Sequence, residues 1–96
     1  MKTVTKQIPL LVTTLHKGVF FGYGLPTDKT EIRLEKAQLC VAWGASMHGV
    51  LGLASMGPDK TCKISPIVPA ITLRDITSIA ECSSEAAEAW GKQPWA

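Results

Sequence analysis

The feature that most constrains the fold is a change in the spacing of apolar residues within residues 31–43. The apolar positions are even at first and odd later: Ile32 and Leu34, then Ala37, Leu39, Val41 and Trp43. Because successive side chains of a strand point to opposite faces, this change near Lys36 implies a β-bulge, a corner or a crossing between layers. A helix over residues 30–42 is the competing interpretation, since Leu34, Ala37 and Val41 also lie at helical spacing.

Short strands are expected on both sides of this segment. Residues 10–14 and 19–23 predict two strands joined by a tight turn, or one strongly bent strand. A strand is also expected over residues 46–56, and alternating residues predict strand over 71–74 and 76–80 with a kink at Asp75. Pro66 and Pro69 exclude a regular central strand between residues 64 and 71.

One helix is predicted, over residues 83–91. Ser83 or Ser84 caps it, and Glu85 lies in the first turn, where the helix dipole favours an anion. Trp90 follows Ala86 by four residues, so the helix can lay an indole ring against the body of the protein.

These elements predict one domain over residues 1–96, because a chain of this length buries a single core. The expected fold class is mainly β: a small, strongly bent antiparallel β-barrel or sandwich with a short C-terminal helix. Residues 1–8 are expected to form a flexible arm. Residues 92–96 are expected to dock through Trp95, on the same domain or on a neighbour.

Composition excludes several classes of protein. The chain is 46% hydrophobic and 19% charged, which predicts a folded protein. A net charge of +2 makes nucleic acid an unexpected partner. No apolar run approaches the roughly 20 residues that span a bilayer, so we expect no membrane association and a soluble, cytoplasmic location. Three widely spaced cysteines predict reduced thiols.

No known catalytic or metal-binding motif is present. His16 and His48 are the two imidazoles, and neither has neighbours with the spacing of a metal site. The glycines match no phosphate-binding loop, and the carboxylates are scattered along the chain. We therefore expect no enzyme activity, no metal and no cofactor.

The residue types favour a ligand that carries both a ring and phosphate. Trp43 is expected to stack on the ring, with His48 lining the pocket and basic side chains neutralising the phosphate. Tyr23 either presents a second ring for stacking or anchors the end of a strand. The predicted ligand-binding set is Trp43, His48, Arg33, Lys60, Lys63, Arg74 and Tyr23.

Several runs together resemble a family of small phage and prophage proteins of uncharacterised function: residues 16–24, 40–43, 49–54, 57–58 and 86–95. This resemblance implies a viral setting and assigns no catalytic residue. Residues 31–37 and 71–76 also resemble strands of Sm-like barrels, in architecture alone, because the typical Sm-like RNA-binding residues are not identifiable.

The function expected from these observations is a non-enzymatic, homo-oligomeric phage protein in the host cytoplasm. It would capture a nucleotide-like ligand, such as a host defence signal, in pockets between subunits. One alternative is an interaction module that inhibits a host protein. Another is a virion component or nucleic-acid-binding ring, which the near-neutral charge disfavours.

Overall fold

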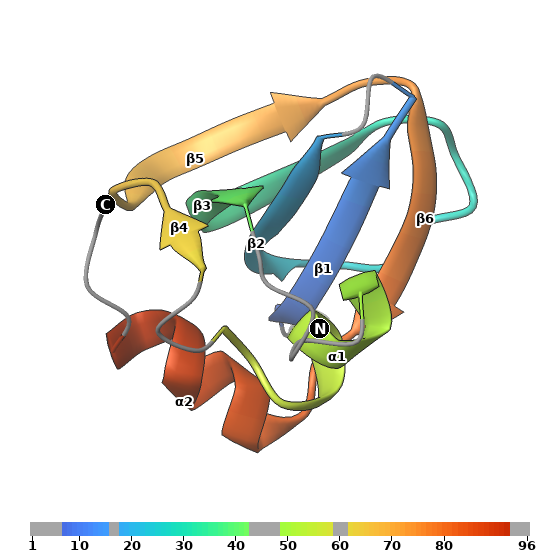
Figure 1. Ribbon diagram of the computed structural model, residues 1–96. Helices are drawn as coiled ribbons and strands as arrows, with labels where there is room; N and C mark the ends of the chain where they lie inside the picture. Colours follow the sequence, from blue (N-terminus) through green and yellow to red (C-terminus); the bar gives the residue numbers. More distant parts are fainter. Residues whose placement is uncertain (1–6, 16–17, 43–48, 59–61, 93–96) are drawn as a thin grey trace, which may run out of the picture.

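The computed structural model describes residues 7–15, 18–42, 49–58 and 62–92. These residues form six strands and two helices (Figure 1). The elements in chain order are β1 (Ile8–Thr14), β2 (Val19–Gly24), β3 (Ile32–Ala42), α1 (Gly49–Ser55), β4 (Lys63–Ile64), β5 (Val68–Leu73), β6 (Ile76–Glu81) and α2 (Ser84–Lys92). The arm of residues 1–8, apart from its last two residues, and residues 93–96 of the tail lie outside the described residues.

The strands form one antiparallel sheet in which β3 is followed by β2, β1 and β6. The long strand β3 pairs with β5 along residues 32–37 and with β4 near its end, so β4 and β5 share one edge of the sheet. The opposite edge is β6. Only two residues separate β5 from β6, so the sheet must curl to bring its two edges together at that point (Figure 1).

Two residues with left-handed backbone make this curl. Lys36 has a φ of +52° in the middle of β3, and Asp75 has a φ of +55° between β5 and β6. The Asp75 carbonyl accepts a hydrogen bond from Leu15 N at 2.9 Å, and Ile76 N donates to Thr30 O at 3.0 Å. The β5–β6 corner is thereby tied to both the end of β1 and the loop before β3. The sheet is strongly bent but is not closed into a barrel, because β5 and β6 do not pair with each other.

The bend at Lys36 confirms the predicted irregularity, and the helical interpretation of residues 30–42 is wrong. The pairing of β2 with β3 shifts register between Phe21 and Tyr23, opposite Lys36. β3 thus turns a corner at Lys36, as the change in apolar parity predicted. Beyond the corner Ala37 and Cys40 are buried, whereas Val41 is 64% exposed, so the odd-numbered apolar residues do not all face the core.

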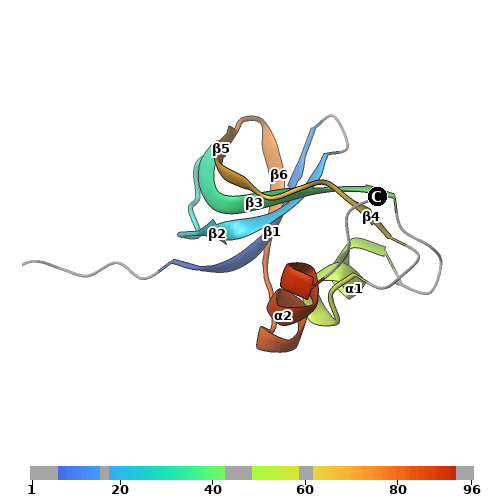
Figure 2. The same cartoon turned by 90° about the vertical axis from the view of Figure 1, so that its left-hand side faces the viewer.

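Two apolar clusters lie on opposite faces of β1. One cluster comes from strands alone and includes Leu10, Val12 and Leu34. The other joins the sheet to α1 and α2 and includes Leu11, Phe21 and Trp90. Figure 2 shows both helices on the same side of the sheet. Leu10, Leu11 and Val12 are all buried, as expected for a strand that is covered on both faces.

The strand predicted over residues 46–56 is wrong, because α1 occupies Gly49–Ser55. This helix buries Leu53 and Ala54 against α2 and the sheet. Gly57 follows with a φ of +81°, and Pro58 comes next. A left-handed glycine followed by proline is a common end of a helix, so this signal was present in the sequence but outweighed by the glycines at 49 and 52.

The predicted C-terminal helix is confirmed as α2. Ser83 caps it, because Ala86 N donates to Ser83 Oγ at 3.0 Å. The fully buried indole of Trp90 stacks on Phe21, with ring centroids 4.8 Å apart and planes 5° from parallel. Its Nε1 donates to the carbonyl of Leu53 at 3.3 Å.

Candidate functional site

The chain leaves the edge of β3 between β4 and β5, and this departure shapes the candidate site. Ser65 N donates to Leu39 O at 2.9 Å. The Ser65 hydroxyl accepts a hydrogen bond from Leu39 N at 2.8 Å and donates to Pro66 O at 3.1 Å. A side chain thus replaces one main-chain bond of the ladder, and Pro66, which has no N–H, sends the chain away from β3.

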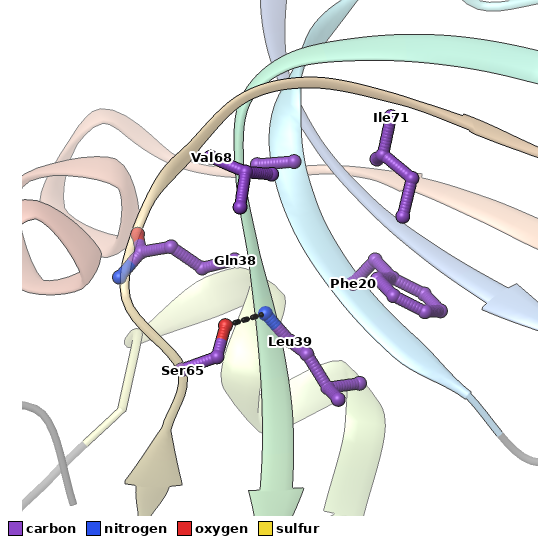
Figure 3. A pocket seen from close by; sticks show the side chains of 7 residues that line it. Phe20, Gln38, Leu39, Ser65, Val68 and Ile71 are labelled. Atoms are coloured by element: carbon purple, nitrogen blue, oxygen red, sulfur yellow. Dashed lines mark hydrogen bonds between the residues drawn. The ribbon is translucent and has the colours of Figure 1, made fainter.

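A cavity of about 210 Å³ opens beside this departure, bordered by side chains of β2, β3 and β5 (Figure 3). The lining residues are Phe20, Ala37, Gln38, Leu39, Ser65, Val68 and Ile71. Most of them are apolar and none is charged. Drug-sized ligands occupy pockets of about 300–1,000 Å³, so this cavity suits one ring or side chain of a larger ligand.

Gln38 is the polar anomaly of this region. Its side chain is only 3% exposed, and its Nε2 atom has no hydrogen-bond partner among the described residues. Figure 3 shows its carboxamide beside the segment that joins β4 to β5. A buried donor without a partner destabilises a protein by about 1–3 kcal/mol, so such a group calls for an explanation. An acceptor supplied by a ligand is one explanation.

The basic residues predicted for the site are not brought together. Arg33 Nη2 lies 3.6 Å from Glu35 Oε2, and Arg74 Nε lies 3.7 Å from Glu31 Oε2. These side chains are largely exposed, and each arginine has a carboxylate beside it, so the start of β3 and the end of β5 carry little net charge together with their flanking residues.

Lys63 lies at the other end of β3. It pairs with Ala42, nine residues beyond Arg33, or about 30 Å along a strand at roughly 3.3 Å per residue. Its side chain is exposed. Among the described residues, the predicted phosphate-binding cations therefore belong to two separate places.

Tyr23 lies in β2 and is half-buried against the cluster beneath the helices. Its ring meets Phe21 edge-to-face, with centroids 5.5 Å apart. This packing corresponds to the strand-anchor interpretation. Trp43, His48 and Lys60 lie outside the described residues.

The three cysteines are buried or half-buried. Cys40 and Cys62 are buried. Burial raises the pKa of the half-buried Cys82 thiol to about 12, so this thiol is protonated at neutral pH and is a poor nucleophile. No three metal-ligating side chains gather within the described part of the chain. No helix there has the length and apolar character needed to cross a membrane.

Sequence reasoning missed the cavity residues, although two signals pointed to them. Gln38 is the only polar residue in the run from Ala37 to Ala42. Pro66 and Pro69 were correctly interpreted as excluding a central strand, and Pro69 indeed lies in the edge strand β5. An edge strand interrupted by proline, next to a polar residue in an apolar run, indicates an opening in the sheet.

Comparison with known proteins gives a family but no activity. No curated protein and no solved structure matches this chain. Residues 7–90, most of the chain and all of the described core, match the model of a domain of unknown function. The chain therefore belongs to the DUF6948 family.

Proposed function

We propose that this protein is a non-enzymatic binding protein whose ligand places one apolar or aromatic group in the cavity beside Gln38. The observation that carries the proposal is the apolar cavity lined by Phe20, Leu39 and Ile71, with the buried Gln38 Nε2, which has no hydrogen-bond partner among the described residues, on the other side of β3 (Figure 3). A ligand that also reaches the Gln38 amide must bear a hydrogen-bond acceptor, because the amide N–H is a donor.

A nucleotide-like ligand meets these requirements in part. A nucleobase is planar, and its ring nitrogens and carbonyl oxygens are acceptors. Phe20 and Ile71 supply an apolar wall for such a ring. The cavity has no charged lining residue, so a phosphate would remain outside it. Lys36, which directly precedes Ala37, is the described cation closest in sequence to the cavity, and Lys63 is two residues from Ser65.

The wider setting is also a proposal. The resemblance to small phage proteins suggests a host molecule, such as a defence signal, as the ligand. Self-association, with pockets between subunits, belongs to the same proposal, and light scattering at micromolar concentration should then show a multimer. The bent β3 and the curled sheet support an Sm-like architecture. The alternative function is a protein-interaction module, which the uncovered edge of β6 favours.

The proposal is tested with Gln38→Leu, a variant that keeps the side-chain size and removes the amide. Nucleosides and nucleotides are titrated into the wild-type protein and followed by NMR. We expect shifts near Phe20 and Ile71, and about tenfold weaker binding to the variant, which corresponds to the loss of one hydrogen bond. Gln7→Leu, at an exposed position outside the cavity, is the matched control.

Other results would lead to different conclusions. If no nucleoside shifts these signals and a host protein co-purifies in a fixed ratio, the interaction module is the better account. If the recovered nucleotide is cleaved, the protein is an enzyme. Equal affinity of the wild-type protein and Gln38→Leu would remove Gln38 from the site.

A further inference from the structure

The outer edge of β6 carries main-chain groups that no described strand pairs with. Cys82 N donates to Pro9 O at 3.0 Å, which sets the phase of the β1–β6 ladder. In an antiparallel pair, every second residue directs its N–H and C=O toward the partner strand. Ala80 and Ser78 therefore face β1, whereas Ile79 and Glu81 direct their N–H and C=O groups away from it. A register shift opposite Thr13 and Thr14 ends this regular phase near Thr77.

Two hollows follow this edge one after the other. The first, of about 270 Å³, is bordered by residues 76–79 and by residues 27–29 of the loop after β2. The second, of about 550 Å³, is bordered by residues 80–83 and by Leu51, Ala54 and Ser55. Side chains of consecutive strand residues alternate between faces, so hollows bordered by four residues in a row lie along the edge of a strand. Figure 1 shows the loop between β2 and β3 beside β6, and α1 near the carboxy-terminal end of β6.

The opposite edge of the sheet is protected, whereas β6 is not. Pro66 and Pro69 lie just before and within β5, and Lys63 lies in β4. Prolines and lysines are the usual devices that prevent an edge from pairing with another chain. From residue 76 to 81, β6 has neither, and its one charged side chain is Glu81 at its end. Its bulge near Thr77 limits the open ladder to Ile79 and Glu81.

The two hollows differ in chemistry. The hollow beside α1 has apolar walls, with Leu51 73% exposed and Ala54 and Ala80 nearby. The protonated Cys82 thiol adds to this apolar wall. The hollow beside the loop is lined by the hydroxyl-bearing residues Thr27, Thr77 and Ser78. It also borders Asp28 and Lys29, whose opposite charges sum to zero. A ligand that follows the edge therefore meets an apolar surface at one end and an uncharged polar surface at the other.

We infer that the β6 edge binds an extended segment of a partner polypeptide by strand addition. The segment runs antiparallel to β6, like every other strand pair of this sheet. Its amino-terminal part lies beside α1 with an apolar side chain near Leu51, and its carboxy-terminal part is polar and uncharged. Main-chain bonds to Ile79 and Glu81 provide the affinity, as in other cases of strand addition.

A free strand suits this edge better than a second copy of the protein. A second β6 would bring its own flanking loop and its own α1 against the same two walls. The edge also lies across the sheet from the cavity beside Gln38, so binding here is independent of the ligand proposed for that cavity.

The test uses a capped seven-residue peptide of alternating threonine and valine, with leucine at its second position and a fluorescent label. A second peptide has the same side chains but is N-methylated at alternate residues, so it cannot donate hydrogen bonds from one edge. Fluorescence anisotropy with the wild-type protein should show binding of the first peptide and at least tenfold weaker binding of the second. Equal binding of both peptides, or no binding of either at millimolar protein, would overturn the inference.

Variants of Glu81 locate the interaction. Glu81→Pro removes one outward N–H and leaves unchanged the residues whose N–H and C=O groups face β1, whereas Glu81→Ala alters the side chain and keeps the N–H. We expect Glu81→Pro to weaken peptide binding about tenfold and Glu81→Ala to change it less than twofold. A dimer in light scattering, with the Ile79 and Glu81 amides protected from hydrogen exchange without peptide, would show that a second copy occupies the edge and would also overturn the inference.

Discussion

The regions around Trp90 and Gln38 each contain a buried N–H group, but only the one at Trp90 has a hydrogen-bond acceptor among the described residues. The Trp90 indole is fully buried and donates to the Leu53 carbonyl at 3.3 Å. The Gln38 amide is almost as deeply buried, and its Nε2 has no partner among the described residues. A donor that is satisfied within the protein stabilises the fold, whereas a buried donor without a partner destabilises it. The first region therefore stabilises the fold, whereas the second contains an unsatisfied donor, which the proposed ligand would explain.

The difference follows from how each region is built. Trp90 lies on a capped helix whose position is set by stacking on Phe21 and by contacts with α1. Gln38 lies two residues beyond the bend at Lys36, where the neighbouring chain leaves the edge of β3 at Ser65. The bend therefore creates both the curl of the sheet and the gap beside it.

The largest expected effect tests whether the Trp90 region is structural. Trp90→Ala removes a fully buried aromatic ring together with its stacking and its hydrogen bond, and such changes destabilise proteins by about 3–5 kcal/mol. Urea denaturation measures the change. Glu88→Ala, on an exposed position of the same helix, is the control and should change stability by less than about 0.5 kcal/mol. A loss below about 1 kcal/mol for Trp90→Ala would show that this region does not hold the fold.

Gly57 gives a second test of whether the packing of α1 against α2 stabilises the fold. Its φ is +81°, and an added Cβ would lie 2.6 Å from the Ala89 Cβ and 2.8 Å from the Ala86 carbonyl oxygen. Gly57→Ala is therefore expected to destabilise the protein by about 1–3 kcal/mol. Gly91→Ala, where a Cβ meets nothing within 4 Å, should be neutral or stabilise α2 by up to about 1 kcal/mol. Equal effects of the two variants in thermal unfolding would contradict the packing described for Gly57.

The bent strand and the C-terminal helix could be predicted from the sequence, because both depend on local patterns. Parity around Lys36 predicted the bend, and serine followed by Glu85 and alanines predicted α2. The helix α1 was missed because Gly49 and Gly52 are poor helix formers, and its stability comes from packing of Leu53 against residues more than 30 positions away. The cavity beside Gln38 depends on the pairing of β3 with a distant segment, which no local pattern specifies.

A substitution of Gln38 should stabilise the protein, in contrast to Trp90→Ala, which should destabilise it. Gln38→Leu removes an unsatisfied donor and fills the same space with apolar atoms, so the free energy of unfolding should rise by about 1 kcal/mol. The measurement is urea denaturation of the ligand-free protein, with Gln7→Leu as the matched surface change. A clear loss of stability in Gln38→Leu would mean that the amide has a partner in solution, and the contrast with Trp90 would fail.

Ser83 tests how firmly α2 is anchored beside the Trp90 region. Its hydroxyl accepts from Ala86 N and donates to Ser55 O at 2.7 Å, so it both caps α2 and holds the end of α1. Ser83→Ala should cost about 1 kcal/mol, the usual value for a lost cap. Ser84→Ala changes the neighbouring exposed serine and should have little effect. A larger loss of stability in Ser84→Ala than in Ser83→Ala would show that Ser84 is the residue that caps α2.

The smallest expected effect concerns Cys82, which lies between the structural region and the β6 edge. Burial raises the pKa of its thiol from 9.0 to about 12 in the folded protein, whereas the unfolded chain keeps the ordinary value. The folded state thus binds the proton more tightly, so this contribution to stability is complete below pH 9 and declines as the pH rises from 9 toward 12. Denaturation midpoints of the wild-type protein and of Cys82→Ala between pH 7 and pH 10.5 measure the difference. We expect the two curves to separate above pH 9, with the wild-type protein losing more stability, and parallel curves would show that Cys82 is hydrated in the folded state.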